Sequence, residues 1–243
     1  MAVTGYHHFR RMAAAYWVLL LGLIVTVVVY RRVAESVTTR DRLRFQTETD
    51  SAFGALRSRV NHYVSALQSL QGFFHADESV NPAKWKRYVP SLVWHREYPN
   101  MLELGYAERV EAERLPEVLK ASRANGWPEF EIQPPGPREV YYPILLFESH
   151  LANSRHGIGY DLGTEPEQLA AMQRACDRSA PVSSGVVSLG SGTETSRLGQ
   201  VVYVPVYHGG REPRSVEERR ANLRGFVIAS TSAADLYRDM LRE

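Results

Sequence analysis

The longest apolar run of the chain covers residues 12–30 and has arginine pairs on both sides. About 20 helical residues at ~1.5 Å rise cross the ~30 Å hydrocarbon layer of a bilayer, where no water can satisfy free backbone groups. A signal peptide has an apolar core of only about 7–15 residues and ends at a small-x-small cleavage site, which this run lacks. The pattern therefore predicts an uncleaved transmembrane helix over residues 12–30, preceded by a short tail, residues 1–11.

Charge does not decide on which side of the membrane the rest of the chain lies. More arginines follow the apolar run than precede it, and simple Lys/Arg counting would place the large C-terminal part inside. That bias governs short loops, whereas long domains translocate largely regardless of charge. The arginine count therefore leaves both sides open.

Residues 33–75 contain almost no glycine or proline, and their second half repeats apolar residues at steps of three and four. This spacing predicts a long stalk helix with one apolar stripe, about 60 Å long if about 40 residues are continuous. The stripe can pack on the domain that follows it or on a second copy of itself, which would make a homodimer. Both alternatives stay open. The stripe consists of Phe53, Leu56, Val60, Tyr63, Leu67, Leu70 and Phe74.

Beyond residue 75, turn residues become frequent and short helical and strand patterns follow one another. Helices are predicted after Asn81, over residues 111–124, and from Thr164 to about Arg178, where Thr164 and Glu167 have capping-box spacing. Strand patterns outnumber helical ones and are often consecutive, which favours antiparallel sheets with helices on one side. The strand patterns cover residues 102–106, 140–147, 157–161, 186–189, 201–207 and 225–230.

Composition excludes several functional classes. The net charge of +2 comes from scattered charges, so no basic stripe for nucleic acid is present. Cys176 is the only cysteine, which excludes an intramolecular disulfide and any multi-thiolate metal site, and its apolar neighbours predict a buried position. The eight histidines are dispersed and no nucleotide or hydrolase motif occurs. We therefore expect no metal, no cofactor and no catalytic residues.

The segment HGIGYD, residues 156–161, is the place where the sequence leaves room for a ligand. If it is a strand, Ile158 and Tyr160 lie on one face, and two glycines, including Gly159, lie with Asp161 on the other. Such a face has a side-chain-sized gap with a hydrogen-bond acceptor at its end, which suits a flat heterocycle bearing N–H groups. Alternatively, Asp161 assists the start of the next helix and the glycines let another strand approach. The residues alone leave both readings open.

Neighbouring segments supply candidate walls and polar groups for this pocket. Apolar side chains on the preceding and following strands would form the walls, although core packing is the alternative for each of them. Serines after the Thr164 helix offer hydroxyl and backbone groups where the chain re-enters the sheet. The candidates are Tyr142, Ile144, Leu146, Val202, Val204, Val206, Ser183 and Ser184.

The order and spacing of these segments resemble the CHASE domain over about residues 98–241. The resemblance is carried by YPNMLELGYAERV, GWPEFEI, EVYYPILLFES, GIGYDLGTEPEQLAAMQRACD, VVSL, VVYVPVY and LRGFVIAS. It implies an α+β fold in which a long N-terminal helix precedes two PAS-like α/β lobes with antiparallel sheets. The sensor domain would then cover residues 76–243, and its membrane-distal lobe would bind the ligand.

CHASE domains are extracytoplasmic ligand sensors of receptor-like histidine kinases, diguanylate cyclases and similar proteins. The resemblance therefore implies a periplasmic or extracellular domain held at the inner (plasma) membrane. In the plant members that bind cytokinins, an aspartate after the strand holds adenine-ring nitrogens, and that motif matches at Asp161. A main-chain contact after the next helix matches near Ser184 or Ser183. The plant sequence is apolar there, so the Ser-Ser pair argues against cytokinin itself and leaves an adenine-like or other small polar ligand open.

The expected function is a non-enzymatic sensing module, whose ligand signal would pass to a C-terminal effector absent from this chain, a histidine kinase or a diguanylate cyclase. We accordingly expect the chain to be part of a longer membrane protein. One alternative is a membrane-anchored scaffolding or adhesion ectodomain that binds no ligand. A second alternative is an enzyme that uses Asp161 with His156. It is disfavoured because residues five apart on a strand face opposite sides.

Overall fold

The computed structural model describes residues 17, 20–27, 30–31, 54, 58, 61–77, 79–92, 94–98, 100–151, 154, 156–189 and 198–232. The chain divides into two compact units, residues 1–56 and 57–243. In the first unit, residues 20–27 are helical. Among the described residues no helix has both the length and the apolar character needed to cross a bilayer. The anchor over residues 12–30 stays a prediction, because part of that range lies outside the described residues.

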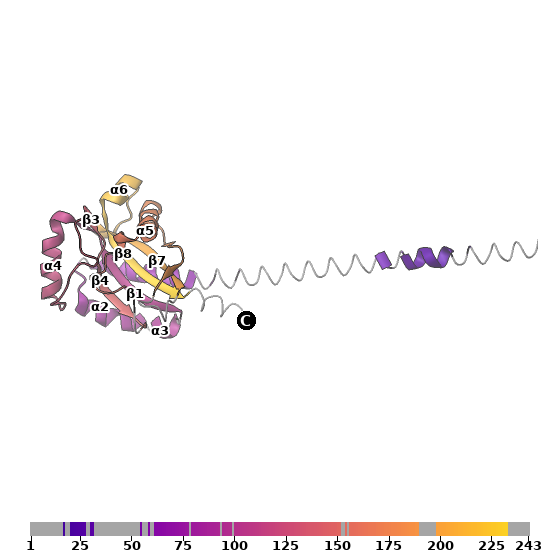
Figure 1. Ribbon diagram of the computed structural model, residues 1–243, viewed down its shortest axis with the longest axis horizontal. Helices are drawn as coiled ribbons and strands as arrows, with labels where there is room; N and C mark the ends of the chain where they lie inside the picture. Colours follow the sequence, from indigo (N-terminus) through magenta and orange to yellow (C-terminus); the bar gives the residue numbers. More distant parts are fainter. Residues whose placement is uncertain are drawn as a thin grey trace, which may run out of the picture. The chain divides into compact units, whose positions relative to one another are not determined.

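The second unit is built on a six-stranded antiparallel sheet with the order β4-β1-β8-β7-β5, in which β6 also pairs with β7 (Figure 1). Numbered in chain order, the five strands of the main path read 2-1-5-4-3, which is compatible with a PAS-like lobe. A separate ladder joins β2 to β3. A second PAS-like lobe stays a prediction. The strands are β1 (Met101–Glu108), β2 (Val110–Glu111), β3 (Val140–Tyr141), β4 (Ile144–Ser149), β5 (Val182–Ser183), β6 (Val187–Ser188), β7 (Leu198–Tyr207) and β8 (Leu223–Ser232).

Helices cover both faces of this sheet, so the prediction of helices on one side only was wrong. On one face, the helix over residues 61–76 and α2 pack against β1, β7 and β8. On the other face, α5 packs against the same strands (Figure 1). The central strands are therefore buried on both sides and read as apolar runs instead of alternating patterns. The helices are α2 (Pro82–Tyr88), α3 (Trp94–Glu97), α4 (Leu115–Ala124), α5 (Pro166–Arg178) and α6 (Val216–Ala221).

The stalk stripe packs on its own domain over the part that the structure describes. Leu67, Leu70 and Phe74 are almost fully buried, and they contact the face of the sheet that carries Leu104 and Val227. The start of the stripe, including Phe53, lies outside the described residues, so the dimer seam stays a prediction. The next helix begins as predicted, because the Asn81 side chain accepts a hydrogen bond from Lys84 N at 3.0 Å and caps α2.

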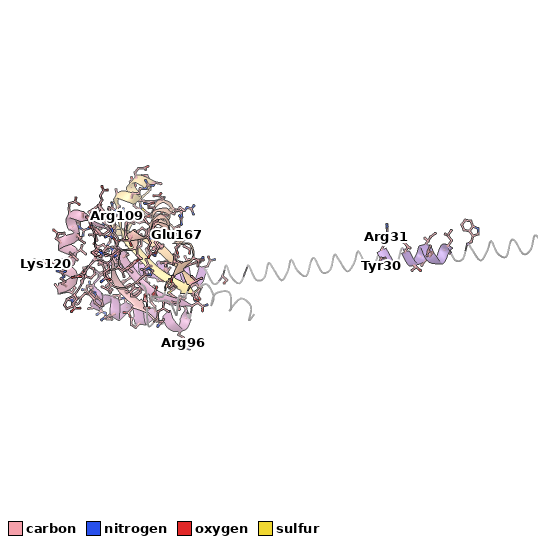
Figure 2. All side chains as sticks on the ribbon, in the orientation of Figure 1. Tyr30, Arg31, Arg96, Arg109, Lys120 and Glu167 are labelled. Atoms are coloured by element: carbon pink, nitrogen blue, oxygen red, sulfur yellow. The ribbon has the colours of Figure 1, made fainter. Side chains whose placement is uncertain are left out.

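The N-cap of helix α5 lies one residue later than the predicted Thr164. Its N-cap is Glu165, without a side-chain cap, and Pro166 occupies the first turn, where its fixed φ suits a helix start. Thr164 instead ends the short 3-10 helix η3 (Leu162–Thr164), and its Oγ1 donates to Asp161 O at 2.8 Å. Glu167, its expected capping partner, lies in the first turn of α5 (Figure 2). The capping-box prediction was therefore wrong, although the helix ends at Arg178 as predicted.

The segment 157–161 is a turn and not a strand. Tyr160 N donates to Gly157 O at 3.0 Å, and only isolated bridges follow, from Tyr160 to Gln133 and from Asp161 to Pro143. A turn has no period-two faces, so the expected arrangement of two glycines beside a carboxylate is not formed. The prediction that Cys176 is buried is confirmed by its 3% exposure.

Leu70 lies on helix 61–76, and its side chain is 0% exposed where the helix meets the sheet. Its replacement tests this packing. We expect Leu70→Ala to lower the free energy of unfolding by about 2–5 kcal/mol, since it removes buried methyl groups and leaves a cavity. Ser69→Ala, at an exposed neighbouring position, is the control and should change it by less than about 0.5 kcal/mol. Denaturant unfolding measures both, and equal effects would show that the helix does not pack as described.

Candidate functional site

Asp161 is fully buried and one of its carboxylate oxygens has a structural role. Its exposure is 0%, and Oδ1 accepts hydrogen bonds from Tyr142 N at 2.8 Å and Gly163 N at 3.0 Å. The first bond joins the carboxylate to the chain between β3 and β4, and the second caps η3. This is close to the alternative in which Asp161 assists a helix start.

The other oxygen, Oδ2, has no hydrogen-bond partner among the described residues. Arg138 lies next to it, with Nε 3.4 Å from Oδ2 and a side chain that is 23% exposed. The Arg138 guanidinium also donates to Gly136 O and Pro134 O, at 3.1 and 3.0 Å. A buried charge is stable only when it is paired, and Arg138 supplies that pairing from the solvent side. A ligand N–H that is to reach Oδ2 must therefore displace Arg138.

The space beside Gly159 is occupied by main chain. Gly159 has φ +88°, and a Cβ built on it would lie 2.1 Å from Glu131 O. Gln133 N donates to Gly159 O at 3.0 Å, which holds the two segments together. The glycine thus admits a neighbouring segment, and the side-chain-sized gap predicted beside it was wrong. This outcome was the stated alternative for Gly159, whereas a Cβ built on Gly157 would meet nothing within 4 Å.

The predicted pocket walls lie on two different faces of the sheet. Ile144 is 0% exposed on the α5 face, where the half-buried Tyr142 also packs. Val204 is 1% exposed on the opposite face, against helix 61–76. The pairing of β1 with β4 shifts in register between Tyr106 and Ala107. At this point the side chains of β4 change the face of the sheet on which they lie. Val204 therefore cannot share a pocket with the other two residues.

The two serines lie at the short strand β5, where β7 engages their polar groups. Ser184 is 5% exposed, and its N donates to Val201 O at 2.8 Å while its Oγ accepts from Val201 N at 3.0 Å. Ser183 is exposed and its Oγ donates to Ser184 O at 3.1 Å. The main-chain N–H of Ser184 is thus bonded to β7, and its carbonyl accepts from Ser183.

A buried polar network that the sequence analysis missed lies between α5 and the sheet. Tyr203 Oη donates to Gln168 Oε1, Gln168 Nε2 donates to Glu165 Oε2, and Tyr160 Oη donates to Glu165 Oε1, each at 2.5 Å. His156 Nε2 lies 3.6 Å from Glu165 Oε1. The sequence held one signal for this network. Gln168 occupies a buried position on the same face of α5 as Met172 and Ala175, where an apolar residue would be expected.

The network sets the charge state of its carboxylate. The pKa of Glu165 is lowered to about 2, first by the neighbouring His156 and then by the hydrogen bonds from Tyr160 and Gln168, against burial, which raises it. Burial raises the pKa of Tyr203 well above its usual range, so this phenol stays a donor. A second buried carboxylate adjoins the network. Glu103 on β1 accepts from Ser230 Oγ at 2.6 Å and from Ser154, whose hydroxyl also contacts His156 O.

A model of the CHASE domain matches residues 78–243. The chain belongs to the CHASE domain family. A solved structure titled "Methyl-accepting Chemotaxis protein X" is similar at 14% identity and a TM-score of 0.43. The alignment covers 79% of this chain and 62% of that one. None of the curated proteins matches. CHASE domains are extracytoplasmic sensor domains of membrane receptors, and an extracytoplasmic sensing module is thus what the family membership establishes.

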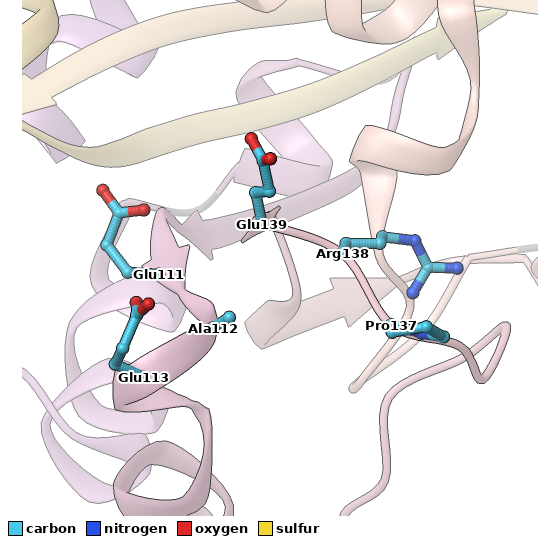
Figure 3. Close-up of a pocket in the computed structure, with 6 residues that line it drawn as sticks. All are labelled: Glu111, Ala112, Glu113, Pro137, Arg138 and Glu139. Atoms are coloured by element: carbon cyan, nitrogen blue, oxygen red, sulfur yellow. The ribbon is translucent and has the colours of Figure 1, made fainter.

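The surface of this CHASE domain near Arg138 carries a shallow acidic groove of about 550 Å³. Its carboxylates come from Glu111, Glu113 and Glu139, and Figure 3 shows the Arg138 guanidinium directed away from them. Glu111 pairs with Arg109 at 2.6 Å. Within the described part of the chain, no group of three or more His, Cys, Asp or Glu side chains could hold a metal ion.

Substitution of Asp161 tests its structural role. We expect Asp161→Ala to lower the free energy of unfolding by about 1–3 kcal/mol for each of the two backbone donors left unpaired, namely Tyr142 N and Gly163 N. Asp161→Asn keeps an acceptor for both donors and should cost less. The two variants are compared by denaturant unfolding at neutral pH, and an Ala variant as stable as the Asn variant would contradict the role.

The lowered pKa of Glu165 predicts a pH dependence of stability. Because its folded pKa of about 2 lies below the usual 4.5, ionised Glu165 stabilises the fold above pH 4.5. That contribution is lost as the pH falls through about 2. We expect the unfolding free energy of Glu165→Gln to fall less than that of the parent chain over this window. Glu167→Gln, on the same helix, should follow the parent. The prediction would be contradicted if the unfolding free energies of Glu165→Gln and the parent chain changed equally with pH.

Proposed function

We propose that this CHASE domain is the extracytoplasmic small-molecule sensing module of a receptor anchored in the inner (plasma) membrane by residues 12–30. The observation that carries the proposal is the family match over residues 78–243. The helical residues 20–27 support the anchor, because large side chains such as Leu21 and Leu23 are 64% and 61% exposed, as lipid contact would require. A histidine kinase or a diguanylate cyclase would receive the signal, and the stalk over residues 33–75 would pair in a homodimer.

The proposed ligand is an adenine-like or other small polar molecule bound on the α5 face of the sheet. The support is chemical. Asp161 Oδ2 is an acceptor with no hydrogen bond among the described residues, and the Arg138 side chain beside it is 23% exposed. A ligand N–H that replaces Arg138 would make a charge-assisted hydrogen bond of about 1.5–3 kcal/mol, or about 10- to 150-fold in affinity. We further propose that the ligand contacts Tyr142, Ile144, Gly159, Ser183 and Ser184, after their present packing and hydrogen bonds rearrange.

Sensing requires that the ligand bind two arrangements of the domain with different affinity. The sheet lies between the proposed site and helix 61–76, because β1, β7 and β8 contact both α5 and that helix. A shift of these strands on ligand binding would change the packing of Leu67, Leu70 and Phe74. This route connects the α5 face to the stalk through side chains in direct contact.

A membrane-anchored scaffolding or adhesion ectodomain is the second candidate function. It is favoured by the closed surroundings of Asp161, where Oδ1 is bonded twice and Glu131 O fills the space beside Gly159. Such a domain would need the buried carboxylates only for its own folding. The two candidates differ in whether any small molecule binds.

Thermal unfolding of the full chain in detergent separates the two candidates. Adenine, adenosine and small carboxylic acids are added singly, and a ligand of the folded state raises Tm as its concentration exceeds Kd. We expect one of these compounds to raise Tm, and the shift to be lost in Asp161→Asn but kept in Asp77→Asn, a surface control. A Tm that no compound moves would favour the scaffold.

A further inference from the structure

A cavity of about 320 Å³ lies on the face of the sheet opposite α5. It is bounded by the start of α2, by α4 and by one end of the sheet, where Tyr106 and Leu146 belong to the core that packs on helix 61–76. Small-molecule sites usually measure about 300–1,000 Å³ and combine apolar walls with a few convergent polar groups. This cavity has both features and shares no lining residue with the surroundings of Asp161.

One wall of the cavity is apolar and pre-formed. Val118 of α4 is 8% exposed, and Leu146 of β4 is 4% exposed. Leu145 and Pro82 add further carbon surface. These residues would bury a short aliphatic body of a ligand, at roughly 25 cal/mol per Å² of apolar surface removed from water.

The remaining lining carries opposite charges close together. Arg114 Nη2 lies 3.4 Å from Glu108 Oε1, and the arginine side chain is 51% exposed while that of Glu108 is 20% exposed. Arg224 of β8 is 9% exposed, and its Nη1 donates to Phe74 O at 3.1 Å. Burial raises the pKa of Glu108, and Arg114 and Arg224 act against that rise. The pair of Arg114 and Glu108 is half open to solvent and can exchange partners.

An unused donor adjoins these charges. Trp127 lines the cavity, and its buried Nε1 has no hydrogen-bond partner among the described residues. An unpaired buried donor costs about 1–3 kcal/mol, so such groups in folded proteins usually have a partner. An acceptor oxygen brought by a ligand would satisfy this donor.

We propose that this cavity binds a small zwitterion with a short aliphatic body, whose carboxylate pairs with Arg114 and whose ammonium group pairs with Glu108. A ligand with a single charge would separate Arg114 from Glu108 and leave one of them without the partner that it has now. A zwitterion replaces the ion pair with two, so both protein charges stay paired. Arg224 lies at one end of the cavity and donates a hydrogen bond to Phe74 O. A ligand in the cavity would therefore lie next to the end of helix 61–76.

The proposal goes beyond the proposed function, because the cavity and Asp161 lie on opposite faces of the sheet. Three probes of matched shape test the charge requirement: L-leucine, 4-methylpentanoate, which lacks the ammonium group, and 3-methylbutylamine, which lacks the carboxylate. Isothermal titration of the full chain in detergent measures each Kd. We expect L-leucine to bind at one site per chain, and each single-charge analogue to bind about 10-fold more weakly or worse.

Substitutions locate the binding. Arg114→Gln and Glu108→Gln should each weaken L-leucine about 10-fold or more, and Ala121→Phe, at an exposed lining position of α4, should abolish it by filling the cavity. Lys120→Gln is the matched control, because Lys120 is exposed on the outer side of α4 and does not line the cavity (Figure 2). Its Kd should equal that of the parent chain.

Three results would overturn the proposal. They are no binding of L-leucine at millimolar concentration, equal affinity for 4-methylpentanoate or 3-methylbutylamine, and binding that Ala121→Phe leaves unchanged. Asp161→Asn should leave L-leucine binding intact. If Asp161→Asn loses the Tm shift caused by adenine-like compounds but still binds L-leucine, the two sites are independent of each other.

Discussion

The antiparallel ladder between β1 and β8 is the contact on which the rest of this domain depends. It joins Met101–Glu108 to the chain from Gly225 to Thr231, and nearly every residue of both strands is buried. The two strands lie very close together at Gly225, because a Cβ on this residue would lie 2.3 Å from Ala107 O. Since both faces of these strands are covered, a change in packing on one face reaches the other through the same residues. That property suits the proposed connection between a ligand and the stalk.

Sequence patterns predicted the elements whose causes are local. Asn81 followed by Pro82 indicated a helix start, and the Asn81 side chain caps α2 as expected. The stripe that includes Leu67 and Leu70 indicated a buried helical face, and both residues are buried. The apolar runs of β7 and β8 were placed within a few residues of their observed ends. In each case a cap or a hydrophobic period determines the element without reference to distant parts of the chain.

The candidate site could not be predicted in the same way, because distant segments decide it. Gly159 has positive φ and meets Glu131 O, and nothing within HGIGYD shows that residue 131 will lie there. Arg138 covers the Asp161 carboxylate from a turn-rich segment more than 20 residues away in the chain. The network of His156, Glu165 and Gln168 likewise needs the fold to bring α5 over the sheet. Residue types singled out residues 156–161 as a candidate region, but tertiary contacts decide which groups face one another there.

The buried charges give the two faces of the sheet different chemistry. The α5 face carries the carboxylates of Asp161, which is bonded through Oδ1, and of Glu165, whereas the opposite face has the partly exposed ion pair of Arg114 and Glu108. Both faces contact the strands on which helix 61–76 packs. Amide hydrogen exchange of the full chain, with and without the compound that raises Tm most, tests this connection most directly. The account predicts slower exchange in residues 61–76 when the compound is bound. Unchanged exchange in that helix, with protection confined to the binding site, would contradict it.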